Sequence, residues 1–288
     1  MWPLIELAVE PKSPEDRTAL VAALAQLAEA DSSLSVSTDR ESGLTILHGS
    51  DEAVLDRKLG ILIHGHGIAL NVGAPQVAYR ETITRRAEIA YSHTKVRGEK
   101  GEFAHVKLVF EPGSRGSVLD FSSSAPPDAV PPSFLAGAVA GLEAARTLGL
   151  LAGFPVIEMK ATLVNGAYHD RDSSPLTFFM AAQAAFKALR DKGGPVLLEP
   201  VMAVEISARP ARLAAIVADL QAHRGAVAAQ DGVVKGLVPL AGLLGYESRL
   251  RGLTEGLGAW SMVFDHYAPI PRATPPDDVF PPAMGMRA

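Results

Sequence analysis

The sequence predicts an α+β fold in which two ferredoxin-like domains flank a third α/β domain of a different kind. Three observations lead to this prediction. Near both ends of the chain, apolar residues follow the order strand, helix, strand, strand, helix, strand, which is typical of a split-βαβ, ferredoxin-like domain. Between these two units, residues 77–195 begin with strands rich in charged residues and contain two helices. The length of 288 residues is enough for two or three domains.

The first unit opens with a weakly alternating strand at residues 4–10, which Pro11 ends. Ser13 is expected to cap the following helix, with Pro14 at its first position, where the missing N–H costs nothing. One face of this helix carries apolar side chains at helical spacing: Leu20, Val21, Leu24, Leu27 and Ala28.

The rest of the first unit contains two short strands, a second helix and a final strand. We expect the strands at residues 34–38 and 44–47, on either side of a turn at 41–43. A helix at 52–59 and a strand at 61–70 complete the βαββαβ order.

The second unit repeats this order without obvious sequence repetition. Pro210 opens its first helix, and Arg224 and Gly225 end it. The expected elements are a strand at 201–207, a helix from 210, strands at 226–229 and 233–239, a helix at 240–250 and a strand at 259–266.

The middle segment contains a helix at residues 132–148 and another that begins at Pro175 and ends before Gly193. A strand at 156–163 precedes the second helix, and the polar loop 166–174 joins the two. Residues 71–75 and 192–195 have the composition of domain junctions. From residue 268 to the end the chain contains six prolines in 21 residues, which is typical of an extended or disordered tail.

Composition and charge exclude several classes of protein. The chain has no cysteine, which excludes disulfides and thiolate metal sites and is compatible with a reducing cytosol. From its first residues we expect no signal peptide, and its most apolar stretch is too broken by charge to span a bilayer. No Gly-x-x-x-x-Gly-Lys-Ser/Thr motif occurs, so the usual nucleotide triphosphatase chemistry has no site here.

The charge distribution leaves two interpretations of the middle segment open. The net charge of −5 argues against a general nucleic-acid coat. Residues 80–115, however, contain eight basic and five acidic side chains. This local excess fits either a surface that faces phosphates or an ordinary solvated strand face.

The most informative stretch is the loop 166–174, Gly-Ala-Tyr-His-Asp-Arg-Asp-Ser-Ser. A loop this polar between two well-formed elements lies at the surface, where function is usually found. Asp172, Ser173 and Ser174 have a sufficient structural explanation as the N-cap of the helix that begins at Pro175. His169 and Asp170 stand outside the cap and have no such explanation.

Two enzymatic interpretations compete with simpler ones. His64 and His66 would share one face of a strand and could supply two metal ligands, but no third ligand is evident, so two histidines at a strand end is the simpler explanation. A hydrolase could use His169 and Asp170 with Ser173 as nucleophile. Three residues so close in one loop seldom meet the geometry of a triad, and no Gly-x-Ser-x-Gly elbow is present.

Six segments of the chain resemble the C-terminal part of elongation factor G, in the order in which that family has them. The resemblance is most specific in the loop motif Tyr-His-Asp-x-Asp-Ser-Ser at 168–174, and it spans roughly residues 3 to 271. The other segments are residues 71–83, 103–106 with 110–112, 151–156 with 160–163, 194–202 and 264–267.

The resemblance implies four regions: residues 1–75 and 197–270 as ferredoxin-like third and fifth domains, 76–196 as a fourth domain like domain 2 of ribosomal protein S5, and a Pro-rich tail at 271–288. The fourth domain is expected to contain a left-handed βαβ crossover, against the usual rule. In the family, the tip of this domain enters the decoding region of the small ribosomal subunit and follows the tRNA–mRNA duplex.

The resemblance also implies a set of binding residues and partners. The tip residues are Gly166, Tyr168, His169, Asp170 and Arg171, and the neighbouring loop contributes Lys100, Gly101 and Glu102. The expected partners are the ribosome, its rRNA and the tRNA–mRNA complex, with no DNA and no membrane, in the cytoplasm. GTP and Mg²⁺ belong to the GTPase domain of the full-length family, so we expect no cofactor, no metal and no enzymatic activity in this chain.

Two departures from the family pattern indicate a divergent paralogue. The third-domain run Gly-Glu-Leu-His-Leu-Glu is replaced here by the sequence at 49–56, and the neighbouring loop has Gly-Glu-Lys-Gly-Glu at 98–102 in place of Gly-Gly-Arg-Gly-Gln. The two added carboxylates should weaken contact with a phosphate backbone. A ribosomal protection factor of the kind that displaces tetracycline is the alternative within the wider family, although its tip loop would be expected to differ.

Overall fold

The structure, a computed structural model, describes residues 3–31, 34–39, 43–97 and 100–271. The described chain divides into two compact units, of which one contains residues 79–198 and 266–270. The expected Pro-rich tail beyond residue 271 and residues 41 and 42 of the expected turn lie outside the described residues. We describe each sheet and its helices separately.

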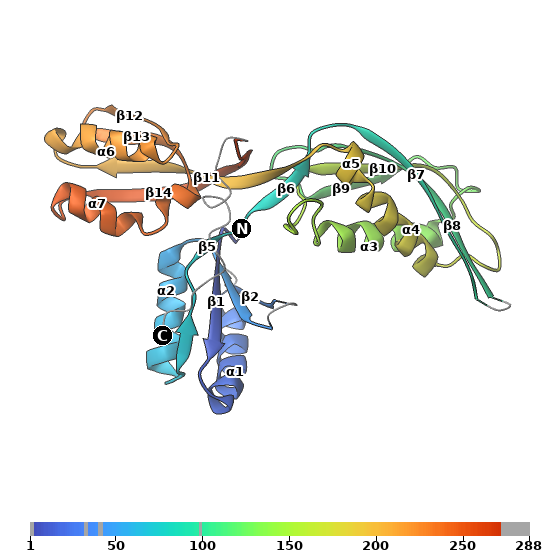
Figure 1. The fold of residues 1–288 in the computed structure, drawn as a ribbon, viewed down its shortest axis with the longest axis horizontal. Helices are drawn as coiled ribbons and strands as arrows, with labels where there is room; N and C mark the ends of the chain where they lie inside the picture. The colour runs from blue at the N-terminus through green and yellow to red at the C-terminus, as the bar shows by residue number, and fades with distance from the viewer. Residues whose placement is uncertain (1–2, 32–33, 40–42, 98–99, 272–288) are drawn as a thin grey trace. The chain divides into compact units, whose positions relative to one another are not determined.

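The N-terminal domain has the predicted ferredoxin-like order (Figure 1). Its sheet has the strand order β2-β3-β1-β4, and β5 also pairs with β1. The elements are β1 (Ile5–Pro11), α1 (Pro14–Ala30), β2 (Ser35–Thr38), β3 (Thr45–Gly49), α2 (Glu52–Gly60), the π-helix η1 (Ile61–Gly65), β4 (Leu70–Val72) and β5 (Gln76–Val77).

Capping fixes the starts of both helices in this domain. The Ser13 hydroxyl accepts the backbone N–H of Asp16 at 3.0 Å, and Pro14 occupies the first helical position, as predicted. Asp51 caps α2 by accepting the N–H of Val54 at 2.8 Å.

The strand predicted at residues 61–70 is wrong for most of its length. The chain continues from α2 directly into η1, where the N–H of His66 donates to the carbonyl of Ile61. Leu62 is fully buried in this helical position, so tertiary packing overrides the β-propensity of Ile61 and Ile63. Only residues 70–72 form a strand.

The C-terminal domain has the same topology, with the strand order β12-β13-β11-β14. The helix predicted at 240–250 is in fact a 3₁₀ turn and a separate helix, because Gly245 takes the left-handed conformation at φ 65° between them. The elements are β11 (Pro195–Ser207), α6 (Pro210–Ala222), β12 (Ala226–Gln230), β13 (Val233–Pro239), η2 (Leu240–Leu243), α7 (Tyr246–Thr254) and β14 (Ala259–Pro269).

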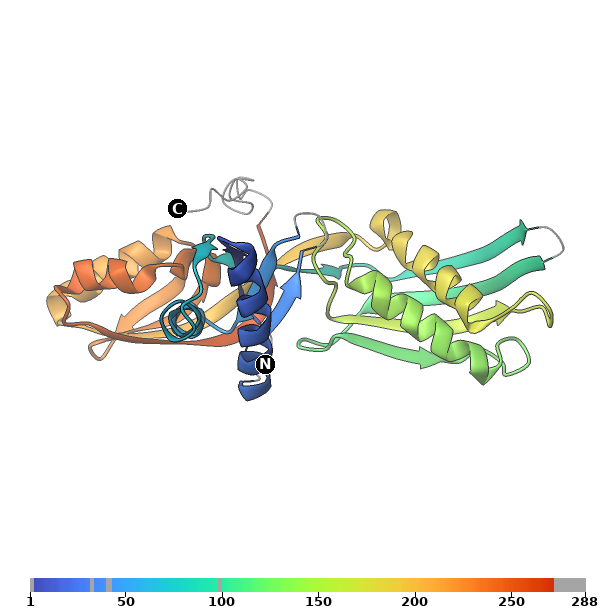
Figure 2. The ribbon, with the colours of Figure 1, turned by 90° about the horizontal axis from the view of Figure 1, so that it is seen from below.

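The middle domain is built on a four-stranded sheet of order β7-β8-β10-β9. The helices α3 and α4 lie side by side on one face of this sheet (Figures 1 and 2). The parallel pair β9 and β10 is joined through α3, and β6 pairs with the start of β11. The elements are β6 (Arg80–Ile83), β7 (Ala87–Arg97), β8 (Lys100–Pro112), β9 (Leu119–Ser123), α3 (Pro132–Arg146), β10 (Met159–Ala167), α4 (Pro175–Lys187) and α5 (Leu189–Lys192).

The strand predicted at 156–163 begins three residues later than expected. Glu158 has a positive φ of 54°, which breaks the extended chain, and regular pairing starts at Met159. The strand then continues to Ala167, closer to the polar loop than the sequence pattern indicated.

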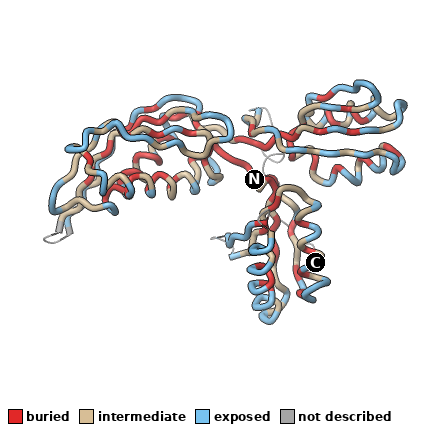
Figure 3. The backbone as a smooth tube through the Cα atoms, turned by 180° about the vertical axis from the view of Figure 1, so that it is seen from behind, coloured by how far each residue is buried: buried red, intermediate tan, exposed pale blue. Residues whose placement is uncertain are grey.

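The core of the middle domain lies between the sheet and its two helices. Buried residues follow the inner faces of these elements, while much of the surface near the end of the β7–β8 hairpin is exposed (Figure 3). The largest fully buried side chains there are Phe110, Phe178 and Phe186. No helix within the described residues is long and apolar enough to cross a membrane.

Candidate functional site

The candidate site is the loop between β10 and α4, residues 168–174, which we call the tip loop. It lies beside the outer part of the β7–β8 hairpin, because the N–H of Phe103 on β8 donates to the carbonyl of Asp172 at 2.8 Å. Two elements far apart in sequence are thus joined at this end of the domain. The structure brings Gly101 and Glu102 of the hairpin close to the tip loop.

A β-bulge on β10 decides which side chains enter the site. Leu163 pairs with Leu108 on β8, but Asn165 pairs with Lys107, so the register shifts by one residue at Val164. Gly166 then pairs with Val106, which faces the core. The extra residue therefore reverses the alternation along β10. Odd-numbered side chains face the core up to Leu163, whereas even-numbered positions do so from Gly166 onward.

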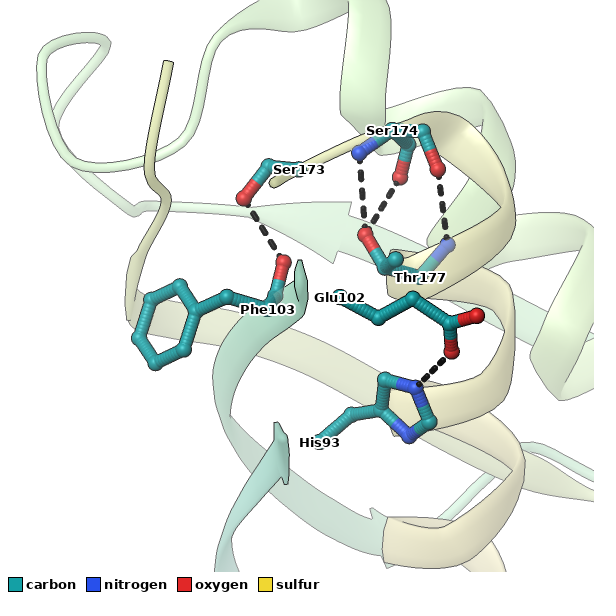
Figure 4. A network of polar contacts seen from close by, with 6 residues as sticks. All are labelled: His93, Glu102, Phe103, Ser173, Ser174 and Thr177. Carbon is teal, nitrogen blue, oxygen red and sulfur yellow. Dashed lines mark hydrogen bonds and ion pairs between the residues drawn. The ribbon is translucent and has the colours of Figure 1, made fainter. Parts of the chain in front are cut away.

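Ser174 and Thr177 form a complete capping box at the start of α4 (Figure 4). The Ser174 hydroxyl accepts the N–H of Thr177 at 3.2 Å, and the Thr177 hydroxyl accepts the N–H of Ser174 at 2.9 Å. The cap predicted for residues 172–174 is therefore confirmed for Ser174 alone, which frees the side chains of Asp172 and Ser173 for other contacts.

Ser173 bridges the tip loop and the hairpin. Its hydroxyl donates to the carbonyl oxygen of Phe103 at 2.6 Å (Figure 4) and accepts the backbone N–H of His169 at 2.9 Å. The sequence interpretation missed this role because it assigned Ser173 to the helix cap. Only the register of β8 against the loop, which the sequence does not show, reveals it.

His169 and Asp170 are both exposed, as expected for residues that meet a partner. The His169 imidazole contacts the Asp172 carboxylate, with 3.1 Å between Nδ1 and Oδ2, and its side chain is 58% exposed. Arg171 is also exposed. These three residues form the outward surface of the tip loop.

Gly166 and Tyr168 lie on the inner side of the same region. The Tyr168 ring packs against Phe134 at a centroid distance of 5.6 Å and adjoins the hydrophobic core. A Cβ atom on Gly166 would overlap Val130 and the carbonyl of His105. The structure therefore gives both residues a packing role in shaping the site.

Glu102 lies on β8, where it forms an ion pair with His93 on β7 (Figure 4). The His93 Nε2 and Glu102 Oε2 atoms are 3.0 Å apart, and the His93 side chain is only 14% exposed. Gly101 lies directly against the Asp172 carboxylate, where a Cβ would not fit. The run 98–102, whose glycines suggest a flexible hairpin tip, is in strand β8 from Lys100 onward, and residues 98 and 99 lie outside the described residues.

Part of the basic character of residues 80–115 is balanced by ion pairs. Lys107 contacts Glu88 at 2.7 Å, and this hydrogen bond holds the pKa of the Glu88 carboxyl below its usual range. Arg86 contacts Glu111 at 3.4 Å. The paired residues support the solvated-face interpretation for this part of the hairpin.

The structure gives the alternative metal and hydrolase interpretations no support. His64 lies on the π-helix η1 and His66 ends it, so the two do not share a strand face as expected. Within the described part of the chain, no group of three His, Asp or Glu side chains is placed to hold a metal ion.

Comparisons with known proteins match each region of this architecture. Sequence models match "Elongation Factor G, domain III" at residues 2–74, "Elongation factor G, domain IV" at 75–194 and "Elongation factor G C-terminus" at 196–277. An elongation factor G from Rhodopseudomonas palustris strain BisB18 is 44% identical over 274 residues, covering 93% of this chain and 40% of its relative.

The fold is also similar to that of a crystal structure from Thermus thermophilus. The TM-score is 0.74 at 36% sequence identity, and the match covers 94% of this chain and 41% of the other. The chain thus spans about two fifths of the length of both relatives.

The two ferredoxin-like domains and the S5-like domain with its projecting loop define the class of protein as a translation elongation factor, represented here by domains outside the GTPase core. The chain belongs to the elongation factor G family. Its middle domain corresponds to domain IV, which contains the tip loop.

Proposed function

We propose that this chain is the ribosome-binding portion of an elongation factor G, and that it promotes tRNA–mRNA translocation when it is linked to a GTPase domain. The tip of domain IV would contact RNA in the decoding region. GTP hydrolysis would take place outside the 288 residues, with GTP and Mg²⁺ bound there. The setting would be the cytoplasm, where ribosomes translate.

The observation that carries the proposal is the arrangement of the tip loop. Its backbone is held by Ser173 and by the strand β8, while His169, Asp170 and Arg171 are left exposed. An imidazole, a carboxylate and a guanidinium on a fixed loop can hydrogen-bond the sugars and phosphates of RNA without reading its sequence.

Co-sedimentation of the purified chain with ribosomes over a salt series tests the proposal. We expect salt-sensitive pelleting of the wild type, because phosphate contacts release counterions. His169→Ala should weaken pelleting, whereas His66→Ala, an exposed histidine of domain III, should not. The proposal would be contradicted if the loss of binding in His169→Ala were accounted for by a loss of thermal stability. It would also be contradicted if the wild type did not pellet at low salt.

No observation favours the tetracycline-protection or hydrolase alternatives. The three family models that match are those of elongation factor G. A divergent role within that family agrees with Glu102, where the resemblance leads us to expect glutamine.

A further inference from the structure

We propose that Ser173 and Asp172 are positioning residues, which fix the backbone and the ring of His169 so that the tip presents one imidazole nitrogen as a hydrogen-bond acceptor. This inference rests on the proposed function in RNA contact. It adds the groups that hold the contact residue and the kind of RNA group that the residue is prepared to meet.

The first step is the double use of the Ser173 hydroxyl. A hydroxyl has one proton to donate and lone pairs to accept with. Here the proton goes to the Phe103 carbonyl on β8, and a lone pair takes the N–H of His169. One oxygen atom therefore connects the backbone of the exposed histidine to the sheet of domain IV.

The second step is the independence of this bridge from the helix cap. The capping box of α4 uses only Ser174 and Thr177. Removal of the Ser173 hydroxyl should therefore leave α4 intact and free only the loop that precedes it. If Ser173 served only as a helix cap, removal of its hydroxyl would instead destabilise α4.

The third step is the orientation of the imidazole. The Asp172 carboxylate oxygen Oδ2 lies 3.1 Å from Nδ1 of His169. An ionised carboxylate carries only lone pairs and would repel a lone pair on the facing nitrogen, so a neutral ring places its proton on Nδ1. The other nitrogen, Nε2, then carries a lone pair. Gly101 makes room for this arrangement, because any side chain there would displace the Asp172 carboxylate.

This tautomer selects a class of RNA group. A lone pair on Nε2 accepts from a hydroxyl, whereas a phosphate oxygen offers no proton at neutral pH. The ribose 2′-hydroxyl is the donor that distinguishes RNA from DNA. We therefore expect His169 to meet sugar, and the phosphate contacts to fall to basic neighbours such as Arg171.

The tautomer can be measured without the ribosome. Long-range ¹H–¹⁵N spectra of the ¹⁵N-histidine-labelled chain should show a neutral His169 protonated on Nδ1. Asp172→Ala should shift the population toward the Nε2-protonated form, while Asp120→Ala, an exposed aspartate on β9, should change nothing. An Nε2-protonated ring in the wild type, or an unchanged tautomer in Asp172→Ala, would overturn the assignment.

Ribosome co-sedimentation tests the bridge. Ser173→Ala should weaken pelleting roughly five- to tenfold, as loss of a hydrogen-bonding group would. Ser173→Thr, which keeps the hydroxyl, should restore most of the binding, and Ser114→Ala, at an exposed turn of the same domain, should bind like the wild type. In the double variant with His169→Ala, removal of Ser173 should add little further loss, because its effect passes through the histidine.

The outcomes separate this inference from the proposed function. If the wild type does not pellet, the ribosome-binding proposal itself is wrong. The proposed function stands if the wild type pellets and His169→Ala weakens the pelleting. The positioning role is wrong if Ser173→Ala then binds like the wild type. It is also wrong if the double variant loses binding by the product of the two single losses.

Discussion

Gly137 on α3 lies directly against the backbone of Pro175, the first residue of α4, with no space for a methyl group between them. Gly141, one turn later, meets the backbone of Phe179 in the same way. The two helices therefore approach each other backbone to backbone. Because the tip loop ends at Ser174, directly before Pro175, the spacing of this helix pair sets the position at which the loop enters α4.

We expect Gly137→Ala to destabilise domain IV by about 1–3 kcal/mol, since overpacking forces the helices apart. Denaturant unfolding followed by circular dichroism measures the change. Gly252→Ala is the matched control, because a Cβ atom added to this helical glycine on α7 would meet open space. There the same substitution should stabilise by roughly 0.5–1 kcal/mol. An unchanged free energy of unfolding in Gly137→Ala would show that the helices can move apart without cost.

Glu81 is a second position at which a conservative substitution should lower the free energy of unfolding. Its carboxylate is fully buried and accepts four backbone N–H groups, those of Leu150, Leu151, Ala152 and Phe154. In Glu81→Gln an amide NH₂ would face two of these donors, leaving buried groups unpaired. We expect a loss of roughly 2–3 kcal/mol in unfolding free energy and faster amide exchange at residues 150–154.

The control for Glu81→Gln is Glu143→Gln, which removes the same charge from a half-exposed pair with Arg146 on α3. Such surface pairs contribute about 0–1 kcal/mol. Equal effects of the two substitutions would mean that the loop 149–154 finds other acceptors when the carboxylate is absent.

The sequence was most informative where local chemistry and periodicity agree. Ser13 with Pro14 and Ser174 with Pro175 mark helix starts that the structure reproduces, because an N-cap satisfies its donors within one turn. The sheet topology of both ferredoxin-like domains also follows from element order alone. Errors arose where packing decides, as at η1, where burial of Leu62 keeps residues 61–65 helical.

For the candidate site, the sequence located the loop but not its internal contacts. His169 stood out because no cap or core role explained it. The bridge from Ser173 to Phe103 and the pair of Glu102 with His93 join residues on different elements, so they depend on strand register. Register across a bulged strand is not encoded in any local pattern, which is why these partners were missed.

Alkaline pH should destabilise the C-terminal domain through Tyr246. Burial, and secondarily the charge of Asp219, raise the pKa of this phenol to about 12, and its hydroxyl has no hydrogen-bond partner among the described residues. A raised pKa in the folded state gives stability that is present below the usual value of 10.0 and is lost as the pH rises through 12.

Tyr246→Phe should therefore unfold at nearly the same denaturant concentration as the wild type at pH 7. It should become the more stable of the two by pH 12, by on the order of 2 kcal/mol. Urea unfolding at the two pH values measures this. Tyr91→Phe, at a position 38% exposed on β7, is the control that should follow the wild type. Parallel pH profiles for Tyr246→Phe and the wild type would contradict the expectation.

Glu102 tests the effect of the divergent hairpin on RNA contact. Glu102→Gln removes a negative charge beside the tip loop, so ribosome binding at low salt should tighten roughly two- to threefold, and the gain should shrink as salt rises. Glu88→Gln removes a charge further along the same hairpin and should have less effect. Weaker binding by Glu102→Gln would show that its pair with His93 is needed to keep the hairpin in shape.

The bulge at Val164 lets β10 hold one residue more than its regular pairing with β8 requires. After the extra residue, Gly166 and Tyr168 fall on the core side and His169 on the solvent side. Deletion of Val164 would leave Leu163 paired with Leu108 and Asn165 paired with Lys107, so the tyrosine would stay inward and the histidine outward. Homologues one residue shorter at the bulge should therefore keep the imidazole facing outward on a regular strand, whereas a one-residue change after Asn165 would exchange the two sides.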